Sequence, residues 1–325
     1  MDKPGFVPVD QYLALPRSPA TWLVRDLIPM SGAGLLYGLP KTGKSAAAIQ
    51  LAAAMSGGSD DWLGFNVCTH GCVAYLQLDT PRSTWSLRFD ALPQAGVKYV
   101  KENLWLADRE SLSHFPFDIL NKQHENYLRD TLKQVKPICV FVDTLRKVHA
   151  GDEDNSSQMS NVISALVAAT APAALVIVSH SRKANFERPF DLMSDHRGSG
   201  SVTGEMDGVM CMTHNCIKYG GRNIEESEVR LERVDTGNVN LLLWKPYNNA
   251  DELMRIHKVL NDTKLTSMRA KARALAPQVG KSEEACMSLL RRLNPATITV
   301  SGEKRVVVSG SKLVPTGDTP VTDPE

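Results

Sequence analysis

The chain alternates between short, continuously apolar runs and longer stretches with helical spacing. The clearest apolar runs cover residues 34–37, 72–78, 137–142 and 174–178. Continuous rather than alternating apolar runs are typical of strands buried on both faces of a parallel sheet. Helical segments are expected between them, at about residues 46–55, 83–92, 125–135 and 159–169. The pattern therefore predicts an α/β fold with a mainly parallel sheet.

Weaker signals extend this sheet on both sides. Further strands are expected at residues 104–106, 208–212, 228–234 and 241–244, and a loop between the second and third of them is expected to hold Lys218, Gly220, Gly221 and Arg222. Residues 1–30 are rich in proline and are expected to form an irregular lead-in that packs on the core. Residues 184–200 lack periodicity and read as a long functional loop. One large domain over residues 31–247 is the prediction.

A second, smaller domain is expected over residues 251–310. Helical spacing occurs at residues 251–260, 266–276 and 282–293, and two apolar runs at 298–300 and 305–308 flank a turn. Three helices followed by a hairpin predict a small winged helix-turn-helix. Lysine and arginine outnumber acids here, which favours duplex or forked DNA, although a winged helix that docks on protein remains open. Residues 311–325 are expected to be disordered.

A phosphate-binding loop follows the first apolar run. Residues 38–45 fit G-x-x-x-x-G-K-[ST] and lead directly into a good helix-forming segment. In such a loop the backbone N–H groups wrap phosphates, the lysine reaches the terminal phosphates and the hydroxyl binds Mg²⁺. The expected cofactors are therefore ATP and Mg²⁺. The residues expected to bind the nucleotide are Gly38, Leu39, Pro40, Lys41, Thr42, Gly43, Lys44 and Ser45.

Two acids stand where predicted strands end. Asp79 follows the run at 72–78, and Asp143 ends the run at 137–142. Ligands of open parallel sheets bind at the carboxyl ends of the strands. Asp143 is expected to hold Mg²⁺ together with Ser45, the arrangement that a phosphate-loop nucleoside triphosphatase needs. The alternative is that Asp143 only caps the helix that follows.

Basic residues gather after two of these strands although the chain as a whole is nearly neutral, with a formal net charge of +1 over 325 residues. A local positive surface at one edge of the sheet would bind a nucleic acid backbone. The expected DNA contacts are Arg146, Lys147, Arg182, Lys183 and Arg188. An alternative for the first two is that they begin a helix and pair with Asp152 and Glu153.

Composition limits the remaining classes. No apolar run approaches the length of a membrane span and the amino terminus lacks a secretory core, so a cytoplasmic protein without a membrane partner is expected. Two groupings of cysteine and histidine, residues 68–72 and 211–216, have the residue types that could bind zinc. Cys72 and Cys211 adjoin apolar runs, and the preferred interpretation is that they are free cysteines that behave as small buried hydrophobes.

Taken together, five motifs in order resemble a RecA-like ATPase, most closely the plasmid RepA-type hexameric replicative helicases. They are the phosphate loop, residues 77–79, 141–146, 179–183 and 197–199, and the resemblance covers roughly residues 20–245. It implies that His180 senses the γ-phosphate and that Asp79 is the catalytic acid, although the family usually has glutamate there. The resemblance leaves the arginine finger open, and Arg233 is the candidate.

The resemblance implies a homo-oligomeric motor, most concretely a hexameric ring, that moves on single-stranded DNA as a helicase or translocase. ATP would lie between subunits. Two alternatives stay open at this stage. One is a RecA-paralogue recombination mediator. The other is a nucleotide-switched DNA-binding regulator with slow hydrolysis, which the shorter acid at position 79 favours.

Overall fold

The fold is taken from a computed structural model of the chain. It describes residues 7–14, 22–93, 96–112, 116–181, 191–196, 201–234, 243–247, 258–259, 264–279, 283, 286–287, 298–301 and 305–308. The chain divides into two compact units, Met1–Tyr247 and Asn248–Glu325. No helix in the described ranges is long and apolar enough to cross a membrane.

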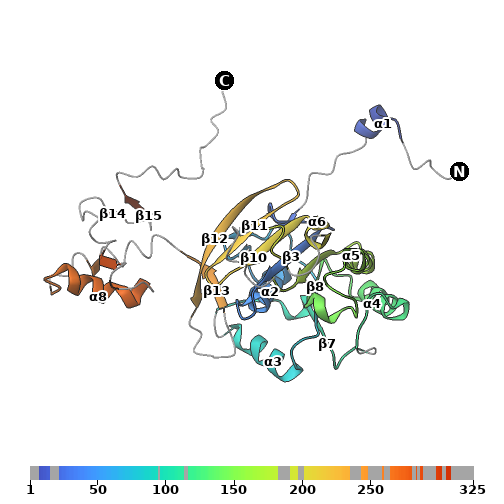
Figure 1. Ribbon diagram of the computed structural model, residues 1–325, viewed down its shortest axis with the longest axis horizontal. Coiled ribbons are helices and arrows are strands. Elements are labelled where there is room, and N and C mark those ends of the chain that lie inside the picture. Colours follow the sequence, from blue (N-terminus) through green and yellow to red (C-terminus); the bar gives the residue numbers. More distant parts are fainter. Residues whose placement is uncertain are drawn as a thin grey trace. The chain divides into compact units, whose positions relative to one another are not determined.

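The first unit is built on a sheet whose described strands number nine. In spatial order they are β13-β12-β11-β10-β3-β9-β8-β6-β7. The strands from β7 to β10 pair in parallel, and β11, β12 and β13 continue the sheet antiparallel. Their bounds are β3 Ala33–Gly38, β6 Val73–Gln77, β7 Leu104–Asp108, β8 Cys139–Asp143, β9 Ala174–Val178, β10 Gly208–Met212, β11 Cys216–Gly221, β12 Ile224–Val234 and β13 Leu243–Pro246. Figure 1 shows this sheet through the centre of the unit.

Helices cover both faces of the sheet, because successive strand residues point to opposite sides. One face packs on α2 (Lys44–Ala53) and α3 (Arg82–Ala91) through Leu36, Tyr75 and Phe141. The opposite face packs on α4 (Lys122–Val135) and α5 (Ser156–Thr170). The latter two helices lie side by side (Figure 1). This doubly covered sheet confirms the predicted α/β class with a mainly parallel sheet.

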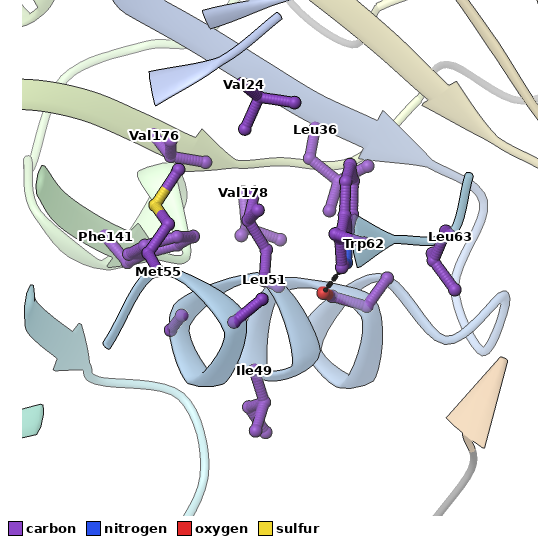
Figure 2. Close-up of a cluster of buried hydrophobic side chains, with 14 of the residues drawn as sticks. Val24, Leu36, Ile49, Leu51, Met55, Trp62, Leu63, Phe141, Val176 and Val178 are labelled. Carbon is purple, nitrogen blue, oxygen red and sulfur yellow. Dashed lines mark hydrogen bonds between the residues drawn. The ribbon is translucent and has the colours of Figure 1, made fainter. Parts of the chain in front are cut away.

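The helix that follows the phosphate loop sits in the larger core (Figure 2). Leu51 and Met55 point from this helical segment toward Phe141, Val176 and Val178 of the sheet. The α-helix continues as a π-helical turn, Ala54–Gly58, and ends where Gly57 takes a φ of 110°. A residue with a Cβ is strained in that conformation, so the glycine explains why the helix stops there.

The lead-in segment is more regular than expected. It contains α1 (Val9–Ala14) and the paired short strands β1 (Trp22–Val24) and β2 (Ile28–Pro29). A second short hairpin follows α2, formed by β4 (Asp61–Trp62) and β5 (Phe65–Asn66). Leu23, Val24, Leu27 and Ile28 are fully buried. The segment from β1 to β2 therefore packs on the core, as predicted. Its strands have three and two residues, which is too few for an alternating pattern of apolar and polar residues to be recognised in the sequence.

The expected loop around Lys218, Gly220 and Gly221 is wrong. These residues form β11, which joins β12 through a tight turn in which Asn223 has a φ of 65°. Glycine usually marks a loop, but at position 220 a Cβ would lie 2.9 Å from Glu226 Cγ. The small residue here allows close approach of a side chain from the adjacent strand rather than a chain reversal.

An ion pair fixes α3 against the end of β7. The Arg82 guanidinium donates to both carboxylate oxygens of Asp108, at 2.6 and 2.8 Å, and Ser111 donates to the same carboxylate. The hydrogen bonds from Arg82 come first among the causes that lower the pKa of Asp108 to about 2. Since the folded pKa lies below the ordinary value, the carboxylate stabilises the fold above about pH 4, and this contribution disappears as the pH falls through about 2.

We therefore expect an Arg82→Gln variant to be less stable than wild type at pH 7, with a difference that shrinks as the pH falls from 4 toward 2. The variant loses the cation, so its Asp108 protonates nearer the ordinary pKa. Urea unfolding at a series of pH values measures both curves. A difference that stays constant down to pH 2 would contradict the assignment.

The second unit has fewer described residues. It contains α8 (Met268–Val279) and a two-stranded hairpin, β14 (Ile298–Ser301) paired antiparallel with β15 (Arg305–Val308). Arg273 of this helix forms an ion pair with Glu283 at 3.1 Å. Most residues of the expected first and third helices, and all of 311–325, lie outside the described residues. The winged helix-turn-helix accordingly stays a prediction.

Candidate nucleotide-binding site

The phosphate loop connects the carboxyl end of β3 to the amino end of α2. Lys41 has a φ of 66° and Gly43 a φ of 90°, so the chain turns twice through the left-handed region within three residues. Such turns direct successive backbone N–H groups inward and form a concave site for anions. The first turn of α2 adds N–H groups without helical partners and the positive end of the helix dipole.

Glycine at the start of the loop is required by its neighbour. A Cβ at Gly38 would lie 2.2 Å from the carbonyl oxygen of Met212, at the end of β10. Any other residue would push the loop away from the sheet. The loop therefore gains its position from close packing of β3 on β10.

Lys44 is almost completely buried, with an exposed fraction of 5%. Its Nζ donates to the carbonyl of Leu39 at 2.8 Å, and the Thr42 hydroxyl donates to the same oxygen at 2.9 Å. Burial lowers the pKa of the ammonium to about 8, partly opposed by the negative charge of Asp143. Lys44 is therefore mostly protonated at neutral pH, as a residue that holds phosphate must be.

Asp143 lies at the carboxyl end of β8 and is 1% exposed. Its Oδ2 accepts a hydrogen bond of 2.9 Å from the hydroxyl of Tyr75, and its carboxylate also bonds Ser45. Burial raises the pKa of Asp143, while these two hydrogen bonds and the nearby Arg88 oppose the rise. The residue at the start of the following 3-10 turn (Leu145–Lys147) is Thr144, so Asp143 does not cap it.

Asp79 follows β6 on the same edge of the sheet and is about half exposed. Its Oδ1 lies 3.5 Å from Nζ of Lys147, which follows β8. The alternative pairing of Lys147 with Asp152 or Glu153 is therefore not what the fold shows. Arg146 beside it is exposed. The negative charge of Asp79 also contributes to the raised pKa of Asp143.

The strand β9 lies between β3 and β8, so the residues after it enter the same edge. Ser179 and Ser181 donate their backbone N–H groups to Leu36 and Gly38, each at 3.0 Å. His180 between them is half-buried. Nε2 of the buried His196 lies 2.9 Å from the Ser179 hydroxyl. The end of β9 is thus hydrogen-bonded to Gly38 at the start of the phosphate loop and to His196, which lies 17 positions after Ser179.

The other predicted site residues lie elsewhere. Arg233 is on β12 with an exposed side chain, three strands away from β3, and the fold does not bring it to the phosphate loop of the same chain. Arg182, Lys183 and Arg188 lie outside the described residues. No group of three or more potential zinc ligands occurs among the residues that the structure describes.

Sequence reasoning missed two residues of this site, Tyr75 and Arg88. Tyr75 pairs in register with Phe141, and residues two apart on a strand share a face, so its hydroxyl reaches Asp143 on the neighbouring strand. Arg88 is half-buried on α3, with its guanidinium 5.7 Å from the ring centre of Trp85. The sequence did show an aromatic residue, Tyr75, near the end of the strand that precedes Asp79. That its hydroxyl reaches Asp143 follows only from the order of the strands in the sheet.

The residues present fit a nucleoside triphosphate with Mg²⁺. Turned N–H groups and a buried ammonium suit phosphates, and a hydroxyl bonded to a buried carboxylate suits a hydrated Mg²⁺. Lys44 would hold the phosphates, and Ser45 and Asp143 would hold the ion. The bound ion would neutralise charge on the transferring phosphoryl group.

Fold and site together define a phosphate-loop ATPase of RecA-like type. The chain belongs to the AAA domain family AAA_25, whose profile matches residues 2–185. A comparison with proteins of curated function found no match. Among solved structures, a KaiC-like protein, PH0186, from the archaeon Pyrococcus horikoshii OT3 is similar over 70% of this chain and 94% of its own, with 12% identity and a TM-score of 0.45.

Proposed function

We propose that this ATPase is a DNA motor of RecA/RepA type, a hexameric helicase or single-strand translocase of phage or plasmid replication. The observation that carries the proposal is the meeting of two surfaces at one edge of the sheet. Asp143, which bonds Ser45 of the phosphate loop, ends β8, and the exposed Arg146 and Lys147 follow this strand, with Lys147 paired to Asp79 at 3.5 Å. Nucleotide and DNA would therefore bind close enough to influence each other.

Each site residue has a role in this proposal. Lys44 stabilises charge on the transferring phosphoryl group, and Asp79 orients the attacking water. Aspartate is one methylene shorter than the glutamate usual in the resembling helicases, so the water must lie closer to the strand. His180, next to the backbone bonds that join β9 to the phosphate loop, reports the γ-phosphate to the DNA loops. Arg233 would act as the finger from a neighbouring subunit.

The contact between Lys147 and Asp79 supports coupling of DNA to hydrolysis. A surface ion pair of this kind is weak, so a DNA phosphate can compete for the lysine. Release of Asp79 would then free its carboxylate to orient water. The same contact favours a second candidate function, a nucleotide-switched DNA-binding regulator whose hydrolysis is slow, because Asp79 is engaged until DNA arrives.

The second unit would contact duplex or forked DNA in the proposed motor. Support comes from the basic composition of residues 251–310 and from the hairpin of β14 and β15, in which Arg305 is the first residue of β15. A protein partner is the alternative for this unit. Binding of the full chain to a forked duplex, compared with a chain ending at Asn249, separates the two.

We expect the triple variant Arg146→Ala, Arg182→Ala, Lys183→Ala to bind single-stranded DNA at least tenfold more weakly at moderate salt and to lose most DNA-stimulated hydrolysis. Each neutralised phosphate contact lowers affinity in a salt-dependent way. Fluorescence anisotropy with an oligonucleotide and phosphate release with and without DNA measure the two effects. Hydrolysis without DNA should be retained.

The matched control is Lys98→Ala, Lys101→Ala. Both lysines are exposed and precede β7. They therefore lie toward the amino ends of the parallel strands, whereas the phosphate loop follows the carboxyl end of β3. This control should bind DNA like wild type. If the triple variant also binds like wild type, the DNA surface is wrong, and if wild type binds no single-stranded DNA, the motor assignment fails while the ATPase remains.

A further inference from the structure

Tyr75 is a fully buried residue of β6 whose hydroxyl is directed at Asp143. Its ring stacks on Phe141, with ring centres 5.2 Å apart and an angle of 1° between the planes. On another side the ring contacts Trp85 of α3, with centres 5.0 Å apart at 50°. The hydroxyl donates to Asp143 Oδ2 at 2.9 Å. Two aromatic neighbours therefore fix the direction of one hydrogen bond.

That bond adds a second hydrogen bond to a buried carboxylate, beside the one with Ser45. The carboxylate of Asp143 is buried and bonds Ser45 as well as Tyr75. The terminal torsion of an aspartate is broad, so packing alone orients its oxygens poorly. A hydrogen bond from a rigid donor to one oxygen fixes the plane of the whole carboxylate. The second oxygen is then directed consistently relative to the Ser45 hydroxyl.

We propose that Tyr75 is a positioning residue for the divalent cation, which it serves by holding Asp143 in the orientation that binds Mg²⁺ with Ser45. The inference rests on the proposed roles of Ser45 and Asp143. Partners that orient a metal-binding carboxylate commonly contribute 10- to 100-fold to metal affinity. The same ring packs on Trp85 of α3. Cation binding is therefore also linked to the packing of α3 on the sheet.

The test is a Tyr75→Phe variant, which keeps both ring contacts and removes only the hydroxyl. We expect about tenfold weaker binding of Mn²⁺, a spectroscopic substitute for Mg²⁺, to protein loaded with a non-hydrolysable ATP analogue. Electron paramagnetic resonance counts the free Mn²⁺ in this titration. The Mg²⁺ concentration for half-maximal hydrolysis should rise by a similar factor. Affinity for a fluorescent ATP analogue in EDTA should change less than twofold.

Two further variants separate positioning from general damage. Tyr75→4-aminophenylalanine retains the ring and a donor, so it should restore cation binding. It also provides the test if the phenylalanine variant fails to fold. Tyr219→Phe removes the hydroxyl of a tyrosine that packs edge-on against Phe65. This control should leave cation binding unchanged.

The outcomes are distinguishable from those that test the ATPase. If wild type hydrolyses ATP with Mg²⁺ and Tyr75→Phe binds Mn²⁺ as tightly as wild type, the positioning role is wrong and the ATPase stands. Equal loss of nucleotide affinity with and without metal would also overturn it, since that indicates a general structural effect. If wild type needs no divalent cation, the proposed roles of Ser45 and Asp143 fail first.

Discussion

Replacing Lys44 by alanine is expected to lower Mg²⁺-dependent ATP hydrolysis by at least a factor of about 100, the usual effect of removing one group that stabilises the transferring charge. The lysine is the one cation of the phosphate loop that is buried beside Asp143. The free energy of unfolding should not fall. Burial of the charged ammonium is itself unfavourable, as its pKa of about 8 indicates, and the substitution removes this unfavourable contribution. Phosphate release and thermal unfolding measure the two properties.

Lys133→Ala is the matched control for this experiment. Lys133 lies on α4 with an exposed side chain that pairs with Asp130, 2.9 Å away. Its replacement should leave hydrolysis at the wild-type rate. A Lys44→Ala protein that is folded and hydrolyses ATP within tenfold of wild type would refute the assigned phosphate contact.

Replacing Trp62 by alanine is expected to lower the free energy of unfolding by about 3–5 kcal/mol, the range for truncating a large buried aromatic residue. Trp62 is 2% exposed and donates its indole N–H to the carbonyl of Ala47 on α2 at 2.9 Å. Figure 2 draws this hydrogen bond as a dashed line from Trp62. Its ring also packs on Phe65. Removal would leave a cavity beside the helix that carries the phosphate loop. Equilibrium unfolding in urea measures the change.

The same substitution at Trp105 provides the comparison. Trp105 lies on the edge strand β7 and is 53% exposed. Trp105→Ala should therefore cost less than about 1 kcal/mol, as for most exposed positions. Similar losses for both tryptophans would mean that Trp62 does not occupy the core in the way described.

The strands of the parallel region could be predicted because they are buried on both faces and hence continuously apolar. Residues 174–178 gave the bounds of β9 directly, and the phosphate loop was recognisable from its glycines and Lys44 alone. The antiparallel edge was harder, since β12 is mostly exposed and its residues need no apolar period. At that edge the two glycines Gly220 and Gly221 led to the prediction of a loop where the structure has the strand β11.

Contacts between strands distant in sequence were not predictable from local pattern. The bond from Tyr75 to Asp143 spans 68 positions, and the ion pair of Lys147 with Asp79 joins the ends of two different strands. Each depends on strand order and register, which a single sequence does not encode locally. The acids and bases of the candidate site could be named individually, but their partners could not.

The placement of β3 has a consequence for how the chain folds during synthesis. Its two neighbours in the sheet are β9 and β10, which end at Val178 and Met212. At about 5–20 residues per second, the ribosome needs roughly 10 to 35 s after Gly38 to complete the second neighbour. Until Val178 completes β9, the buried strand β3 has no partner strand on either side, and until Met212 completes β10 it has at most one. We therefore expect the nascent chain to be a good chaperone substrate, and truncation before residue 212 to yield insoluble protein.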